Sequence, residues 1–236
     1  MIDVHYWPTP NGHKVTLLLE ELADVGAPLQ YTLEPVNIGK GDQFDPAYLA
    51  ISPNNKMPAI VDHAPADGGA PLSVFESGAI LLYLAEKTGR FLPRDLRDRT
   101  ATLEWLFWQM GGLGPMTGQY GHFHVYAPEV IDYARARYAK EAQRLLGVLD
   151  RRLAGRAFIA GEEYTIADMA CYPWIGVYDK APIDLTPYPE VRRWQAAIAA
   201  RPATGRAYAL DRQVNPDAGK PMGDEEKRLL FGIEQR

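Results

Sequence analysis

The hydrophobic pattern of this 236-residue chain changes character near residue 95. Before that point, short runs of β-type residues that predict strands alternate with helical stretches. After it, apolar residues recur only at the three- and four-residue spacing of helices. Such a chain is expected to form a mixed α/β structure followed by a separate helical one. We therefore predict two domains, at residues 1–89 and 95–210, with a linker at 90–94 and a tail at 211–236.

The first 89 residues predict a sheet of four strands. The string "IDVHYW" alternates apolar and polar side chains and stops at Pro8, which cannot continue a strand ladder. A helix from His13 to Val25 leads to "PLQYTLEPV", a second strand that the crossover makes parallel to the first. After a short helix at 46–50, "MPAIVDH" and "APLSVF" form a predicted hairpin, and a last helix ends at Gly89. The order βαβ–α–ββα predicts a mixed sheet flanked by helices.

The remainder of the chain predicts helices alone. The string "GGLGP" interrupts the first helical segment, where we expect a bend or a helix end. A long helix is predicted from Pro128, a favourable first-turn residue, to Ala154, and "YTIADMACYPWIGVY" supplies a third helix. Further helices are expected at 189–200 and 202–210, whereas the polar tail from Asp211 receives no firm structure.

Composition and charge disfavour several classes of partner. The formal charge is −5 and no stripe of Lys or Arg precedes residue 130, so nucleic acid is not an expected partner. No apolar run is long enough to span a membrane, and the first residues do not resemble a signal peptide. The single cysteine, Cys171, cannot form an internal disulfide. We expect a cytoplasmic protein whose partner is a small molecule.

Five strings carry a resemblance to a known family: "PTPNGHKV", "ISPNNKMPAIVDH", "FESGAILLYL", "GGLGPM" and "RPATGRA". They are similar to the glutathione transferases, and the four strings other than "FESGAILLYL" resemble the bacterial nu class, relatives of the yeast prion-forming nitrogen regulator. The resemblance covers nearly all of residues 1–210. It implies a thioredoxin-like N-terminal domain, an all-helical C-terminal domain, reduced or oxidised glutathione as cosubstrate, no metal, and a homodimer.

Three residues of these strings are candidates for binding glutathione. X–Pro is the only peptide bond that becomes cis at modest cost, and the resemblance implies that the Met57-Pro58 bond is cis. The backbone of Met57 would then pair with the cysteinyl backbone of glutathione; an edge-strand proline without a ligand is the alternative. Glu76 and Ser77 open a helix whose N-terminus favours an anion, and the resemblance implies that they hold the γ-glutamyl group. Helix capping alone is the alternative for this pair.

The group that activates the thiol is expected in the loop after the first strand. Glutathione is a nucleophile only as thiolate, so some donor must stabilise the anion. By resemblance, the hydroxyl of Thr9 and the amide of Asn11 donate hydrogen bonds to the sulfur, although both are also ordinary turn residues. Neither is a base at neutral pH, so their catalytic role would be electrostatic. Tyr6 is a rival donor, but an aromatic within a strand is also at home as packing.

Two further candidates lie outside this loop. Gln43 and Arg137 match positions that contact glutathione in the family. Arg137 lies at one edge of an apolar helical stripe, where it could instead pair with Glu141, and Arg135 lies at the opposite edge.

Other residues with chemical potential are interpreted as structural. Thr165 and Asp168 form a predicted capping box at a helix start. Cys171 is expected to be a buried apolar group, and His122 and His124 lack further nearby ligands for a metal.

These inferences favour a glutathione-dependent disulfide-bond oxidoreductase that uses bound glutathione thiolate and no protein cysteine. A conjugating glutathione transferase or an organic hydroperoxide peroxidase would share the same thiolate and differ only in the electrophile. A noncatalytic glutathione-binding regulator is a third possibility.

Overall fold

A four-stranded mixed sheet in the order β2-β1-β3-β4 organises the N-terminal part of the computed structural model. β1 (Ile2–Tyr6) pairs in parallel with β2 (Tyr31–Pro35) and antiparallel with β3 (Ala59–Asp62). β3 in turn pairs antiparallel with β4 (Leu72–Phe75). The first pair is parallel because α1 (Pro10–Asp24) crosses over between its strands. The predicted mixed sheet is therefore confirmed.

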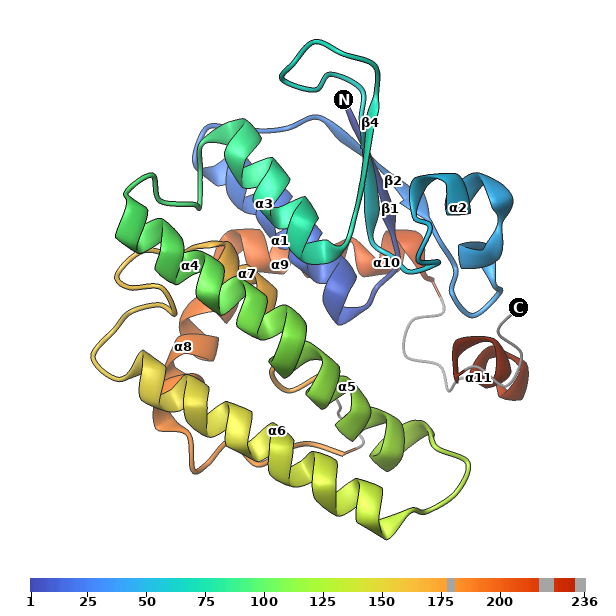
Figure 1. Cartoon of the computed structure of the whole chain (residues 1–236), viewed down its shortest axis with the longest axis vertical. Helices are drawn as coiled ribbons and strands as arrows, with labels where there is room; N and C mark the ends of the chain where they lie inside the picture. The colour runs from blue at the N-terminus through green and yellow to red at the C-terminus, as the bar shows by residue number, and fades with distance from the viewer. Residues whose placement is uncertain (178–180, 217–222, 232–236) are drawn as a thin grey trace. The chain divides into compact units, whose positions relative to one another are not determined.

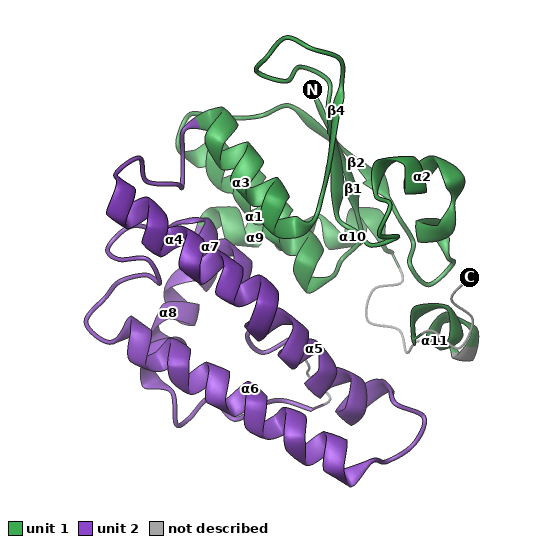
Figure 2. Ribbon diagram, viewed as in Figure 1, with its two compact units in different colours: residues 1–88, 202–236 green, residues 89–201 purple. Residues whose placement is uncertain are grey.

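The structure describes residues 1–177, 181–216 and 223–231, which divide into two compact units (Figure 2). The first unit combines Met1–Thr88 with Pro202–Arg236, and the second is Gly89–Arg201. Packing thus groups the segment after residue 201 with the sheet, whereas the sequence prediction followed chain order and placed 202–210 with the helical part.

Helices cover both faces of the sheet in the first unit (Figure 1). α3 (Ser77–Thr88) and α9 (Pro202–Ala209) pack against α1 on one face, and the short α2 (Pro46–Ile51) lies by β3 and β4. Gly89, with a left-handed φ of 65°, follows α3 as predicted. Arg206 fixes α9 to α1 through ion pairs with Glu20 (2.7 Å) and Asp24 (2.6 Å).

A buried polar cluster joins the sheet to the C-terminal segment. The hydroxyl of Tyr6 donates to Asp211 Oδ1 at 2.6 Å, in the short helix α10 (Asp211–Val214). The same hydroxyl lies 3.3 Å from His13 Nδ1, and the His13 ring stacks on Tyr208 with centroids 4.1 Å apart. Burial lowers the pKa of His13 to about 4, and burial also raises the pKa of Asp211. His13 is therefore neutral in the fold at neutral pH.

The tail contains more structure than the sequence analysis assigned. Besides α10 it forms α11 (Asp224–Phe231), while residues 217–222 and 232–236 lie outside the described part. α11 lies against the loop before α2: a Cβ at Gly39 would be 2.8 Å from Glu226 Oε1, and one at Gly41 would be 3.7 Å from Leu229.

The second unit begins with a nearly continuous helical segment. α4 (Leu96–Trp108) passes through a π-helical stretch, Gln109–Leu113, into α5 (Gly114–Gly121), and a second π-helical stretch covers His122–Tyr126. The sequence predicted a bend or a helix end at "GGLGP". The helix does not end there but changes from α-helical to π-helical hydrogen bonding over Gln109–Leu113. The small residue Gly114 permits this, because a Cβ there would lie 2.5 Å from the side chain of the buried Gln109.

Two predicted helix boundaries were wrong. α6 runs from Asp132 to Leu153 and starts four residues after Pro128, because Ile131 is extended (φ −113°, ψ 91°) and the residues before it are exposed. α7 (Ile166–Cys171) is shorter than predicted and passes into a 3₁₀ turn that contains Pro173, whose ring cannot continue the α-helical bonding. Tyr178, the end of the predicted helix, lies outside the described residues.

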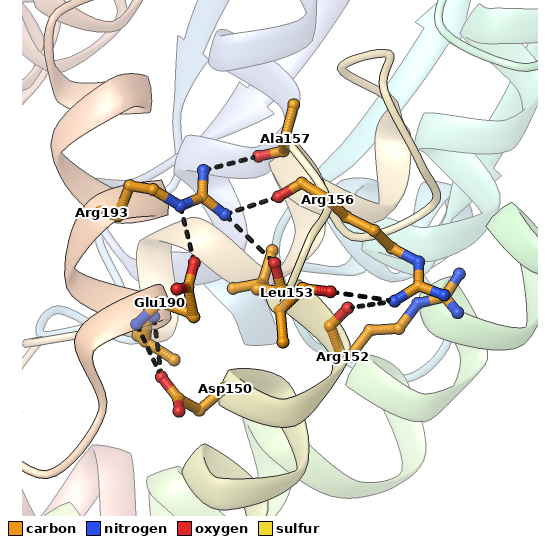
Figure 3. A network of polar contacts seen from close by, with 9 residues as sticks. Asp150, Arg152, Leu153, Arg156, Ala157, Glu190 and Arg193 are labelled. Atoms are coloured by element: carbon orange, nitrogen blue, oxygen red, sulfur yellow. Dashed lines mark hydrogen bonds and ion pairs between the residues drawn. The ribbon is translucent and has the colours of Figure 1, made fainter.

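Side chains reciprocally cap α6 and α8 (Pro189–Ala199) (Figure 3). Asp150 Oδ1 accepts hydrogen bonds from the first backbone N–H groups of α8, at Glu190 (2.8 Å) and Val191 (3.1 Å). In return, the Arg193 guanidinium donates to the carbonyl group of Leu153, the last residue of α6, and to those of Arg156 and Ala157 just after the helix. Within the described residues, no helix combines the length and the apolarity needed to cross a membrane.

Among the described residues of the second unit, Asp168 is the most fully buried carboxylate. It accepts hydrogen bonds from the N–H of Ile159 (2.9 Å), the N–H and hydroxyl of Thr165 (3.0 and 3.2 Å), and the indole of Trp194 (2.8 Å). With Thr165 it forms the predicted capping box of α7. Burial raises the pKa of Asp168 to about 6, against the lowering effect of its donors.

Replacing Asp168 by Ala should lower the free energy of unfolding by about 3 kcal/mol, because buried donors lose their acceptor. Urea unfolding followed by circular dichroism measures this. Asp184, an exposed carboxylate that accepts from the N–H of Thr186, is the matched control, and Asp184→Ala should change stability by about 0.5 kcal/mol or less. Equal losses in the two variants would contradict the importance of burial.

The neutral state of His13 should make stability depend on pH. The unfolded chain binds this proton near the ordinary pKa of 6.5, whereas the folded chain binds it near 4, so stability should fall as pH decreases through that window. Between pH 7 and pH 5 we expect His13 to contribute about 2 kcal/mol to the loss. Urea unfolding at both pH values should show this loss reduced in His13→Gln but not in His63→Gln, at an exposed histidine. The same loss in wild type and His13→Gln would disprove the assignment.

Candidate functional site

Thr9 stands where β1 ends and α1 begins. Its backbone is extended and its side chain caps the helix, since Oγ1 accepts a hydrogen bond from the N–H of Gly12 at 3.2 Å. The same hydroxyl donates to Met57 Sδ at 3.3 Å. Its proton is thus directed at a sulfur atom beside the first turn of α1.

The start of α1 lies against the end of β1 with no room for a side chain at Gly12. A Cβ there would lie 2.3 Å from the carbonyl oxygen of Trp7 and 3.0 Å from Met57 Cε. Glycine therefore allows the turn that carries Thr9 and Asn11 to approach the Met57 loop. Asn11, the second residue of α1, is partly exposed.

Tyr6, the rival donor, is fully buried, and its hydroxyl donates to Asp211. Burial, first, and this hydrogen bond raise the pKa of Tyr6 far above its ordinary value. The phenol is thus part of the polar cluster with His13 and Asp211.

The Met57-Pro58 peptide bond is cis, as the resemblance implies. The carbonyl group of the preceding residue, Lys56, accepts hydrogen bonds from Tyr48 and from Ser52, both at 2.8 Å. Within the described ranges no hydrogen bond reaches the backbone N–H or C=O of Met57. Both groups can therefore pair with an extended peptide.

Glu76 and Ser77 form the corner between β4 and α3. Glu76 is left-handed (φ 68°), a conformation that non-glycine residues adopt rarely and that clusters at functional sites. Its carboxylate accepts a hydrogen bond from Asn54 Nδ2 at 3.3 Å. Ser77 is buried and is the first residue of α3, where the helix dipole is positive. This corner suits a ligand with a carboxylate and an ammonium group.

Gln43 is buried with one polar atom unsatisfied. Its Nε2 donates to the carbonyl oxygen of Ile38 at 3.3 Å, but its Oε1 has no partner among the described residues. A buried acceptor without a donor costs about 1–3 kcal/mol. An N–H group of a bound peptide could supply the missing donor.

Arg137 lies on α6 in the second unit and is exposed. In the part of the chain that the structure describes it makes no hydrogen bond or ion pair, and Glu141 pairs instead with Arg144 at 2.7 Å. Arg135 is committed to the fold, because its Nε donates to the carbonyl oxygen of Phe123 at 2.9 Å. Of the two arginines that periodicity left open, Arg137 has the available guanidinium.

Cys171 is fully buried in α7, in agreement with its interpretation as a packing residue. His124 bonds through Nδ1 to the carbonyl group of Tyr120 at 2.9 Å. Across residues 1–177, 181–216 and 223–231, no three His, Cys, Asp or Glu side chains gather in a way that could hold a metal ion.

Lys14 is a residue of this region that the sequence analysis missed. It is 1% exposed, and its Nζ donates to Ser77 Oγ at 3.3 Å. A signal was available: Lys14 precedes the buried Leu18 by four residues, so a charged side chain occupies the apolar stripe of α1.

Strand register gathers these segments at one end of the sheet. Ala59 pairs with both His5 and Phe75. The chain leaving β1 toward Thr9, the chain entering β3 from Met57, and the chain leaving β4 toward Glu76 therefore lie at the same edge. Arg137 belongs to the second unit.

Comparisons with known proteins agree with this arrangement. A model of the glutathione S-transferase N-terminal domain matches residues 2–86, and one of the C-terminal domain matches residues 115–202. The Escherichia coli (strain K12) protein named disulfide-bond oxidoreductase YfcG is 59% identical over 207 residues, which cover 88% of this chain and 94% of that protein.

Solved structures are similar as well. A glutathione transferase family member from Pseudomonas fluorescens pf-5, with two glutathione bound, has 44% identity and a TM-score of 0.81, with 88% of this chain and 92% of that chain covered. A glutathione transferase from Pseudomonas putida, with one glutathione disulfide bound per subunit, has 42% identity and a TM-score of 0.79, with coverage of 89% and 91%. Since the two domain models span most of its length, this chain belongs to the glutathione S-transferase family.

Proposed function

We propose that this protein is a glutathione-dependent disulfide-bond oxidoreductase whose nucleophile is the thiolate of bound glutathione. The observation that carries the proposal is the direction of the Thr9 hydroxyl. It donates to the sulfur atom of Met57 beside the first turn of α1, so it can donate to a sulfur of a ligand at the same place. The only cysteine of the chain, Cys171, is fully buried, so no protein thiol competes for this role. The name of the E. coli relative and the glutathione disulfide bound to the P. putida protein support the same reaction class.

In this proposal, glutathione is held along the end of the sheet. The backbone of Met57 pairs with the cysteinyl residue, and Glu76 and Ser77 hold the γ-glutamyl ammonium and carboxylate groups. The sulfur then meets the donors Thr9 and Asn11. Gln43 and Arg137 are proposed as further contacts to glutathione, supported by the unsatisfied Oε1 of Gln43 and the available guanidinium of Arg137.

The proposed reaction has two exchange steps. The first glutathione thiolate attacks a disulfide sulfur, forms a mixed disulfide with one half and expels the other half as thiolate. A second glutathione thiolate attacks the glutathione sulfur of the mixed disulfide, forming glutathione disulfide and expelling the second half. Two glutathiones each lose one electron, the substrate gains both, and the two protons of the glutathione thiols end on the product thiols.

Thr9 and Asn11 accelerate this reaction by stabilising charge. Both are neutral donors, so they lower the pKa of the bound thiol without removing its proton themselves. The N–H of Gly12 fixes the oxygen of Thr9, so this hydroxyl only has to turn its proton from Met57 Sδ to the bound thiolate. The same thiolate could attack an aryl halide or a hydroperoxide, but no feature of this site favours either electrophile over a disulfide.

We also propose a cytoplasmic homodimer with domains at 1–89 and 95–210. The proposed reaction consumes reduced glutathione, and a reducing compartment such as the cytoplasm keeps thiols in that state, which supports the localisation. An exposed apolar row on α4 supports the dimer: Leu96 is 77% and Phe107 is 65% exposed, and Leu103 shares their face of the helix.

Thr9→Ala should lower the turnover of hydroxyethyl disulfide about tenfold or more, because one fixed donor to the thiolate is lost. Glutathione binding should persist, since other groups hold the peptide. Parallel assays with hydroxyethyl disulfide, an aryl halide and an organic hydroperoxide measure the reaction class, and the disulfide should be the best substrate. Ultraviolet titration should show a raised pKa for the bound thiol in Thr9→Ala.

Thr9→Ser keeps the hydroxyl and is the matched control, with turnover near that of wild type. Cys171→Ala should also retain turnover. Unchanged turnover in Thr9→Ala would remove Thr9 from the mechanism, and loss of turnover in a folded Cys171→Ala protein would refute a cysteine-free reaction.

Phe107→Glu should convert the proposed dimer into monomers, because it places a charge in an apolar contact. Sedimentation velocity measures the mass in solution. Tyr133 on α6, an aromatic residue that is 79% exposed, supplies the control Tyr133→Glu, which should remain dimeric. A monomeric wild-type protein would refute the dimer.

A further inference from the structure

Lys14 is a buried lysine of α1 that lies next to Ser77, the first residue of α3. Only 1% of its surface is exposed, although lysine is almost never fully buried without a partner. Its Nζ reaches across from α1 to the first residue of α3 and donates to Ser77 Oγ at 3.3 Å. The charge is therefore placed directly behind the side chain that we propose for binding the γ-glutamyl carboxylate.

This contact determines how Ser77 uses its hydroxyl. An ammonium group can only donate hydrogen bonds, so Ser77 Oγ is the acceptor in this pair. The hydroxyl proton of Ser77 then has to be directed away from Lys14. A carboxylate at the start of α3 would accept that proton together with backbone N–H groups at the helix N-terminus.

The ammonium also contributes its charge. A buried cation attracts a nearby anion more strongly than an exposed lysine does, because the surrounding dielectric constant is lower. The carboxylate would not need to touch Lys14 to gain this attraction, since Ser77 lies between them.

We propose that Lys14 is a positioning residue that orients the Ser77 hydroxyl and makes the site selective for peptides with a free α-carboxylate on the γ-glutamyl group. The inference rests on the proposed function, in which this corner binds glutathione. It assigns the recognition of that carboxylate to a lysine–serine pair, with Ser77 in contact and Lys14 behind it.

Lys87, on the helix that Ser77 begins, provides a matched comparison for Lys14. It lies at the opposite end of α3 and is also largely buried, but its Nζ pairs with Asp62 at 2.7 Å. Loss of that lysine removes a buried ion pair of the fold and leaves the start of α3 unchanged.

The test compares two peptides that differ only in the carboxylate: glutathione and 4-aminobutanoyl-cysteinylglycine, which keeps the ammonium group. Isothermal titration calorimetry gives the Kd of each for wild type, Lys14→Met and Lys87→Met. Lys14→Met should weaken glutathione about tenfold or more, as expected for a lost charge-assisted hydrogen bond. It should leave the Kd of the second peptide within about twofold of the wild-type value.

A double-mutant cycle tests the route through Ser77. If Lys14 acts through the hydroxyl, Lys14→Met should cost much less glutathione affinity in a Ser77→Ala background than in wild type. Lys87→Met should not change the ratio of the two Kd values. Equal weakening of both peptides by Lys14→Met, or full additivity with Ser77→Ala, would overturn the role of Lys14.

The outcomes separate this inference from the proposed function. Wild-type protein that binds neither peptide would refute both, whereas wild type that binds glutathione while Lys14→Met affects the two peptides equally would refute only the lysine. Should Lys14→Met not fold, nuclear magnetic resonance of the Lys14 side chain in wild type decides. Its signal should shift with glutathione and much less with the second peptide, and equal shifts would overturn the proposal.

Discussion

The hydrogen bond from the N–H of Gly12 to the hydroxyl of Thr9 is the contact on which the site depends. It satisfies one of the open donors at the start of α1, and it fixes the oxygen of the same hydroxyl whose proton points at the sulfur of Met57. The Thr9 hydroxyl thus both caps α1 and donates a hydrogen bond to a sulfur atom. The arrangement requires glycine at position 12, because any side chain there would collide with the carbonyl of Trp7.

Two consecutive buried residues of α1 make polar contacts with different parts of the first unit. His13 and Lys14 are both buried, yet His13 contacts Tyr6 on β1 and Asp211 on the C-terminal segment. Lys14 instead contacts Ser77 on α3. Burial keeps the first of these groups neutral by lowering its pKa, so it serves the fold. Lys14 is directed at the end of the sheet where the segments that we propose for glutathione binding come together. One helix therefore connects the stability of the C-terminal segment with the geometry of the site.

Local chemistry made much of the fold predictable. The strand that stops at Pro8, the hairpin and the helix that ends at Gly89 all have signals within a few residues of the element itself. The helix start at Pro128 was wrong because proline permits a first turn without requiring one, and Ile131 is extended. The string "GGLGP" looked like a helix end because the propensity of glycine is local, whereas the packing of Gln109 against Gly114 that keeps the helix intact is not. In the site, the cis bond before Pro58 followed from the family resemblance, whereas the contact of Lys14 with Ser77 joins residues 63 positions apart and needed the structure.

The full burial of Cys171 has a consequence for the conditions under which such an enzyme can work. Reductases that attack with their own cysteine are inactivated when peroxide drives that sulfur to the sulfinic or sulfonic acid, which the cell can seldom reverse. In the proposed reaction, the attacking sulfur belongs to a diffusible peptide and leaves the protein after each turnover. Damage of this kind would consume one molecule of glutathione and spare the catalyst.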